Sequence, residues 1–249
     1  MDESHAMVNR LPTALAAPSR PRWLFRRLAL AAPPIGMGRL RPLLCEIATQ
    51  PEDSSPFARY AGIATQIKGD HLEPSLSIGV TTDARRGNGH ARTAVALAGL
   101  WARWEYSPLL VEVGGRACET GRQLRRTVPK IADVLTAIEC GQHLPMPQPM
   151  TPSLPNLDVL ADLGRFSLAR LADCGLLREF DAALRERYQR LVWSLPAVGA
   201  GWSAAMFGGT MDRFVLSVHR GRTDRRTVEK LAAELADLHL HPLQMIWHQ

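Results

Sequence analysis

Apolar runs of strand length alternate with longer segments of helical periodicity over residues 76–249. This alternation is typical of an α/β fold, in which helices cross over between parallel strands. We therefore predict a mostly parallel central sheet with helices on both faces. The expected strands are residues 76–82, 108–113, 157–160, 191–195, 214–218 and 243–247. The expected helices are residues 90–104, 121–126, 131–139 and 168–188, and a helix containing Val228, Leu231, Leu235 and Leu238 that Thr223 or Asp224 could cap.

Residues 142–155 interrupt this pattern. Prolines occupy positions 145, 147, 149, 152 and 155 of the segment. Proline has no backbone N–H to give to a strand ladder. We therefore expect residues 142–155 to form a surface loop.

The positive charge is concentrated at the start of the chain. Residues 1–45 carry seven arginines against Asp2 and Glu3, so they account for +5 of the formal net charge of +6. We therefore predict a flexible basic leader over residues 1–45, a folded domain over residues 46–249 and no nucleic-acid partner. The stretch from Trp23 to Leu28 could contact an anionic membrane surface, although a solvated tail is the favoured interpretation.

Cysteine spacing and hydropathy indicate a cytoplasmic protein. The four cysteines, at positions 45, 118, 140 and 174, form no CxxC pair and are expected to be buried, reduced thiols. No signal peptide opens the chain, and no apolar run is long enough to span a bilayer. We expect a cytoplasmic location, with peripheral contact at the inner membrane as a further option through the basic leader.

A glycine-rich turn follows the first expected strand and precedes its helix. Such a turn can cradle phosphate, because the first helical N–H groups and the positive end of the helix dipole face outward. Gly87, Asn88 and Gly89 suit this loop, but His90 and Ala91 stand where a phosphate loop needs a lysine and a hydroxyl. The nearby cations that could replace the lysine charge are Arg85, Arg86 and Arg92.

Seven segments occur in the order found in one family. Together they resemble the cytoplasmic domain of the bacterial tyrosine kinases of capsular and exopolysaccharide export, which are deviant P-loop ATPases related to MinD and ParA. The resemblance covers roughly three quarters of the chain and implies a P-loop NTPase-like fold. The matching segments are residues 55–60, 87–96 (Walker A), 109–114 (Walker A′), 131–135, 154–160, 192–198 (Walker B) and 212–223.

The chain departs from that family at the positions that carry its chemistry. The resemblance places His90 at the Walker A lysine, Ala91 at the magnesium-binding hydroxyl and Ser194 at the Walker B aspartate. Of the two Walker A′ acidic positions, one is Glu112 and the other is Gly114. The ring-forming ExxRxxR positions read Arg59, Gly62 and Thr65, and the tyrosine-rich tail is unmatched.

These departures predict a protein without catalytic residues. The candidate remnants of the nucleotide site are Gly87, Asn88, Gly89, His90, Ala91, Arg92, Glu112 and Ser194. Glu112 is expected to be solvated or arginine-paired, and Ser194 to be an ordinary strand residue. No metal site is expected, because the histidines lack zinc-binding spacing. No cofactor is expected either, although weak ATP or ADP binding stays open.

The resemblance implies an adaptor or regulator of exopolysaccharide or capsule assembly. Its expected partner is the cytoplasmic tail of a polysaccharide copolymerase or chain-length protein, or an active kinase paralogue, and it could form a homo-oligomer. One alternative is an active, divergent ATPase in which Arg85, Arg86 or Arg92 supplies charge and Glu112 holds the metal. Another is a MinD- or ParA-like positioning protein that uses the leader as a membrane tether.

Overall fold

The chain divides into two units, residues 1–30 and 31–249, and every described residue belongs to the second unit. The computed structural model describes residues 40–51, 57–69, 74–82, 89–113, 136–137, 140, 148–151, 154–161, 176–195, 210–219, 224–237 and 243–248. The loop residues Arg85, Arg86, Gly87 and Asn88 therefore lie outside the described residues, as do Gly114 and most of the helices expected over 121–139. The division of the chain at residue 45 stays a prediction.

A seven-stranded sheet forms the centre of the described structure, in the order β3-β4-β2-β5-β1-β6-β7. Six strands run parallel, and β3 pairs antiparallel with β4 at one edge. The predicted α/β fold with a mostly parallel sheet is confirmed. The strands are β1 (Leu76–Thr82), β2 (Pro108–Glu112), β3 (Gln148–Thr151), β4 (Leu154–Ala161), β5 (Arg190–Ser194), β6 (Arg213–His219) and β7 (Leu243–His248).

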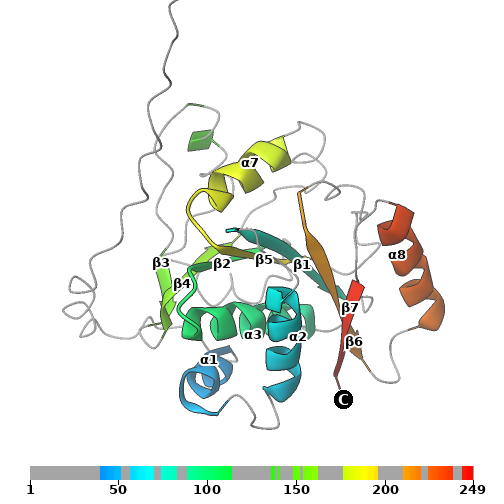
Figure 1. Cartoon of the computed structure of the whole chain (residues 1–249), viewed down its shortest axis with the longest axis horizontal. Coiled ribbons are helices and arrows are strands. Elements are labelled where there is room, and N and C mark those ends of the chain that lie inside the picture. Colours follow the sequence, from blue (N-terminus) through cyan, green and yellow to red (C-terminus); the bar gives the residue numbers. More distant parts are fainter. Residues whose placement is uncertain are drawn as a thin grey trace, which may run out of the picture. The chain divides into compact units, whose positions relative to one another are not determined.

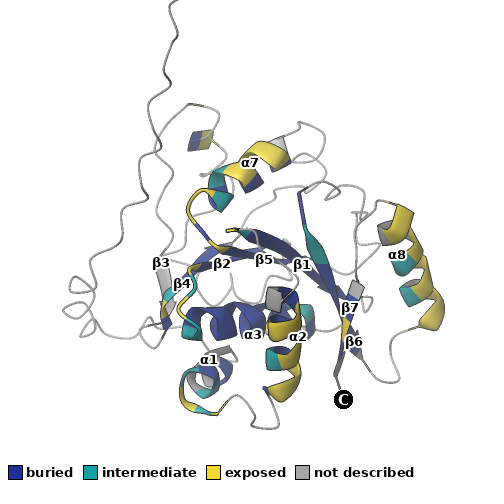
Figure 2. Ribbon diagram, in the orientation of Figure 1, coloured by how far each residue is buried: buried dark blue, intermediate teal, exposed yellow. Residues whose placement is uncertain are grey.

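Helices cover both faces of this sheet, as predicted (Figure 1). On one face lies α3 (Gly89–Arg103), with α1 (Leu40–Thr49) and α2 (Ala58–Gly69) packed against it. On the other face lies α7 (Leu176–Arg185), which contacts β1 and β5. Twelve of the fifteen residues of α3 are buried (Figure 2). The sheet covers one side of this helix, and α1 and α2 pack against its other sides.

The continuous apolar runs in the sequence became the central strands. β1 spans the predicted residues 76–82, and all seven of its residues are buried. Strands buried on both faces lose the polar alternation of a half-exposed strand. The helix expected at 90–104 is α3, and the one expected around Val228 is α8 (Arg225–Asp237). Asp224 caps α8, because its carboxylate accepts a hydrogen bond from the Arg226 N–H at 3.3 Å.

The prediction that residues 142–155 form a surface loop is wrong for part of this segment. Residues 148–151 form strand β3 rather than a loop, and β4 begins at Leu154 rather than at Leu157. Pro149 is tolerated because β3 lies at the edge of the sheet, with a register shift between Pro149 and Thr151. Edge strands and bulges are the places where a sheet accepts a residue without an N–H.

Further differences concern helix ends and one cysteine. The helix expected over 168–188 is described from Leu176 and ends at Arg185, so Tyr188 lies beyond it. Cys140 is a free, exposed thiol, contrary to the expectation of buried cysteines. None of the helices in the described ranges is long and apolar enough to cross a bilayer.

The two helices α1 and α2 were not predicted. The arginine- and proline-rich context of α1 resembles a linker, but Pro42 falls in the first turn, where a helix tolerates it. Leu43 and Ile47 bury against the core, and Arg103 of α3 donates to the Ile47 carbonyl at 3.1 Å. A cation that binds the last carbonyls of a helix stabilises its carboxyl end. Residues 40–45 of the predicted leader therefore belong to a packed helix.

Candidate functional site

The carboxyl ends of the parallel strands bring two of the predicted site residues together. Glu112 ends β2 and Ser194 ends β5, and the two are register partners on adjacent strands. Ser194 in turn pairs with Val80 of β1. In open α/β sheets, ligands bind beyond the carboxyl ends of the strands. The predicted Walker A′ and Walker B positions are therefore neighbours at the edge where such a site would form.

Glu112 is buried, so the first of the two predicted alternatives, a solvated side chain, is wrong, while the second, an arginine-paired carboxylate, stays a prediction. Its residue is 2% exposed, and Ser194 beside it is 1% exposed. Burying an ionised carboxylate is costly unless hydrogen bonds or a cation compensate it. Glu112 is thus a polar group enclosed by the sheet and its helical layer rather than a surface charge.

Ser194 is a strand residue, as predicted, but its hydroxyl has no hydrogen-bond partner in the described part of the chain. The Ser217 hydroxyl of β6 and the side-chain amide of Gln244 in β7 share this property and are also buried. Strand pairing places Ser217 beside Thr82 and Gln244 beside Val215. These polar groups lie on the α3 face of the sheet, because they occupy the same register rows as Val80 or Thr82.

The amino end of α3 begins with four of the predicted site residues. Gly89 and Ala91 are buried, His90 is half-buried and Arg92 is exposed. Ala91 is 3% exposed, and its methyl group offers no oxygen to a cation. The positive end of the helix dipole favours an anion here, but the loop residues that would complete a phosphate cradle lie outside the described ranges.

Tyr60 of α2, which was not among the predicted site residues, lies close to this helix end. Its ring is 1% exposed, and the guanidinium carbon of Arg59 lies 5.4 Å from the ring centre. Burial raises the pKa of Tyr60, while the nearby Arg59, Arg92 and Thr93 act in the opposite direction. The phenol therefore stays neutral and connects the first turn of α2 to the first turn of α3.

A second polar cluster lies on the opposite face, beneath α7, and sequence reasoning missed it. The Ser77 hydroxyl donates to Asp181 Oδ1 at 2.9 Å and accepts from Trp193 Nε1 at 2.9 Å. Arg185 binds Asp181 Oδ2 at 2.5 Å and Asp212 Oδ2 at 2.9 Å. Asp212 accepts from the Ser77 N–H at 2.7 Å. The cluster joins α7 to β1 and to the residue before β6.

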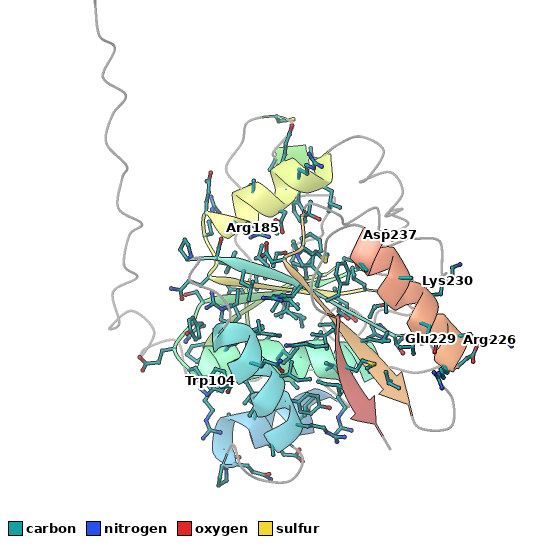
Figure 3. All side chains as sticks on the ribbon, turned by 45° about the vertical axis from the view of Figure 1, so that its right-hand side comes forward. Trp104, Arg185, Arg226, Glu229, Lys230 and Asp237 are labelled. Carbon is teal, nitrogen blue, oxygen red and sulfur yellow. The ribbon has the colours of Figure 1, made fainter. Side chains whose placement is uncertain are left out.

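Burial dominates the electrostatics of this cluster. Desolvation raises the pKa of Asp181, although its ion pair with Arg185 and its hydrogen bond from Ser77 act to lower it. Figure 3 shows Arg185 on α7, away from α8 with its labelled charged residues. Every polar group named in this cluster has a partner, so the arrangement serves to fix α7 on the sheet.

In the parts of the chain that the structure describes, no three His, Cys, Asp or Glu side chains gather in a way that could hold a metal ion. Glu112 is the one carboxylate in the row formed by Glu112, Ser194, Val80, Val215 and Gln244.

The fold is that of the P-loop nucleoside triphosphatases, with a parallel sheet and a helix that follows the first strand. No protein-family model and no curated protein matches the sequence. Similar solved structures are bacterial tyrosine kinase domains and MinD-like proteins. The resemblance seen in the sequence is confirmed at the level of fold.

Three of these structures illustrate the similarity. The VpsO kinase domain shares 21% identity and a TM-score of 0.60, with 77% of this chain and 94% of that chain covered. The kinase domain of the Escherichia coli tyrosine kinase ETK shares 14% identity and a TM-score of 0.63, with 82% and 78% covered. MinD of Aquifex aeolicus shares 15% identity and a TM-score of 0.51, with 70% and 68% covered.

Proposed function

We propose that this chain is a tyrosine-kinase-like domain that does not transfer phosphoryl groups and acts by binding other proteins. In this proposal it is an adaptor or regulator of exopolysaccharide or capsule assembly and export. The observation that carries the proposal is the pairing of Glu112 with Ser194 at the carboxyl ends of β2 and β5. A catalytic site of this fold needs a held metal there, and one side of the pair is an uncharged hydroxyl.

The residues at the amino end of α3 support the same conclusion. Magnesium prefers oxygen ligands in near-octahedral geometry, and Ala91 provides none. His90 is shorter than lysine and mostly neutral near pH 7, so it is a poor substitute for the cation that contacts the outer phosphates. The described residues at this helix end therefore do not fit a magnesium-nucleotide complex.

A fold like that of the kinase domains, without these charges, favours a role in binding. The partner we propose is the cytoplasmic tail of a polysaccharide copolymerase or chain-length protein, or an active kinase paralogue. A MinD- or ParA-like switch is less well supported, because such a switch needs nucleotide turnover. The proposed location is cytoplasmic, with peripheral contact at the inner membrane through residues 1–45 as a secondary proposal.

A phosphotransfer assay tests the proposal. The purified chain is incubated with Mg-ATP and a glutamate–tyrosine copolymer, and both phosphotyrosine and released phosphate are measured. We expect neither product above the background of a heat-denatured sample. Activity that disappears in His90→Ala or Glu112→Gln would instead establish an active, divergent ATPase.

A further inference from the structure

The two edges of the sheet differ in how they are protected against pairing with another strand. At one edge, β3 contains Pro149 and a register shift, and both features hinder the addition of a further strand. At the other edge, β7 has the sequence LQMIWH, without proline, aspartate, glutamate, lysine or arginine. All six of its residues pair with β6, and no described residue pairs with its outer side. An edge of this kind is a template for another strand.

An exposed methionine lies on this open edge. Among the described residues, Met245 is the one large apolar side chain that is exposed, and the residue is 43% exposed. Its register partner on β6 is Leu216, which is fully buried. Side chains alternate between the two faces along a strand, and Gln244 lies on the α3 face. Met245 therefore lies on the opposite face of the sheet, at the end of its apolar surface.

Helix α8 lies on the same face as Met245. α3 connects β1 to β2 in the direction of the β3 edge, whereas α8 connects β6 to β7 in the direction of the other edge. Right-handed crossovers that run in opposite directions lie on opposite faces of a sheet, so α8 is on the face away from α3. Figure 1 shows α8 next to β6 and β7.

The exposed surface of α8 carries opposite charges at its two ends. Arg226, Lys230, Ala233 and Asp237 are exposed and follow one stripe at helical spacing. Arg226 and Asp237 lie about 16 Å apart along the helix axis, too far to pair within one chain. They mark opposite ends of α8 (Figure 3), and neither forms an ion pair with a described residue. The stripe therefore begins with a cation and ends with a carboxylate.

We propose that the chain forms a two-fold dimer in which β7 pairs antiparallel with β7 of a second copy. The sheet then continues through both copies, with the two α8 helices side by side on one face. Residues directly opposite each other in an antiparallel pair share a face, so the two-fold axis falls on a residue rather than between two. An axis at Met245 lets positions 243–247 pair along their whole length and sets the two methionines against each other.

Charge complementarity selects a second copy as the occupant of this edge. The two-fold axis makes the α8 helices antiparallel, so Arg226 of each copy lies beside Asp237 of the other and two ion pairs form. The short side chain of Ala233 in the middle of the stripe lets the helices approach. β7 itself has no carboxylate, lysine or arginine, so no like charges meet where the strands pair. The inference does not depend on the adaptor proposal.

Sedimentation velocity of the full chain tests this inference. We expect a monomer at about 1 μM and a dimer at about 100 μM. Met245→Glu is expected to weaken dimerisation at least tenfold, because it sets two carboxylates directly opposite each other. Arg226→Glu and Asp237→Arg are each expected to weaken it about tenfold, because each variant replaces two ion pairs with two contacts between like charges.

A mixture of the two charge-reversal variants is the most specific test. Arg226→Glu and Asp237→Arg each repel their own copies, whereas a mixed dimer regains both ion pairs. We therefore expect the equimolar mixture to dimerise about as tightly as the native chain. Rescue on mixing also shows that both variants are folded. The control is Arg178→Glu, which makes the same charge change on the exposed surface of α7 and should leave dimerisation unchanged.

The remaining outcomes overturn the inference. A native chain that stays monomeric at about 100 μM excludes this dimer and leaves the β7 edge available to an extended segment of another protein. A dimer that is insensitive to Met245→Glu, or whose charge-reversal variants do not rescue each other, forms through a different surface. The same conclusion follows if Arg178→Glu weakens the dimer as much as Arg226→Glu. None of these results affects the adaptor proposal, which fails only if the chain transfers phosphate.

Discussion

Glu112 and Ser194 are register partners on the adjacent strands β2 and β5, at the carboxyl edge of the sheet. Both are buried, and the serine hydroxyl has no hydrogen-bond partner in the described part of the chain. The pair occupies the place where the resemblance to tyrosine kinases puts two metal-linked carboxylates. Of this pair, Glu112 can carry a negative charge and Ser194 cannot, so the pair offers one carboxylate instead of two.

Ser194→Ala should not destabilise the protein. Its hydroxyl is buried without a described partner, so removing it relieves a desolvation cost, and we expect the free energy of unfolding to stay the same or rise by about 1 kcal/mol. Urea denaturation measures this change. The control is Ser77→Ala, which removes two hydrogen bonds from an equally buried serine and should cost about 1–3 kcal/mol. Equal losses in both variants would mean that Ser194 has a bonding role.

Arg185→Met should destabilise the protein by about 2–4 kcal/mol, because Asp181 and Asp212 lose their shared cation. The matched control is Arg225→Met. Arg225 pairs with Glu229 at the same i, i+4 spacing, but the two side chains are 89% and 58% exposed. That change should stay within about 0.5 kcal/mol. Similar effects of the two variants would show that Arg185 does not anchor α7.

The stability of the native chain should depend on pH through Asp181. Burial raises the pKa of Asp181 above its ordinary value of 3.8, so the folded protein binds a proton that the unfolded chain releases between the two values. The free energy of unfolding contributed by this group is therefore highest below that ordinary value. It falls as pH rises through the window up to the raised pKa.

The measurement is urea denaturation of the native chain and of Asp181→Asn at a series of pH values between about 4 and 7. The native chain should lose more stability than the variant as pH rises across this range. Asp237→Asn, on the exposed end of α8, serves as the control for a removed charge. A native chain that gains stability relative to Asp181→Asn would show that the ion pair with Arg185 outweighs burial.

Restoring the missing groups should restore nucleotide binding. We expect His90→Lys/Ala91→Ser/Ser194→Asp to bind ATP at least tenfold more tightly in the presence of magnesium than in its absence, because the variant regains a cation, a hydroxyl and a carboxylate. Calorimetry of the variant with and without magnesium measures the difference. The matched variant His90→Lys/Ala91→Ser/Ser77→Asp, with the carboxylate on the other face of the sheet, should show no such dependence.

The sequence was most informative where packing is simplest. β1 and α3 were predicted within one residue, because a strand buried on both faces is a continuous apolar run and its following helix is strongly apolar. α2 was missed because its short, mixed side chains show no clear period. β3 was missed because the tolerance of Pro149 depends on the edge position, which is a property of the whole sheet.

Part of the candidate site was also predictable from the sequence. Glu112 and Ser194 were identified through motif order, and the parallel strands brought them together. The cluster around Ser77 and Asp181 was not identified, since its members lie 104 residues apart in the sequence. The approach of Arg59 and Arg92 to Tyr60 depends on how α2 packs on α3, and no local pattern reports that contact.

Isothermal titration of the purified chain with ATP, once with magnesium and once with excess chelator, tests the central claim most directly. We expect magnesium to make no difference: binding is either undetectable or equally weak under both conditions, because Glu112 is the one carboxylate in its row of the sheet and Ala91 offers no oxygen to the cation. Tight binding that requires magnesium, and that is lost in Glu112→Gln, would contradict it.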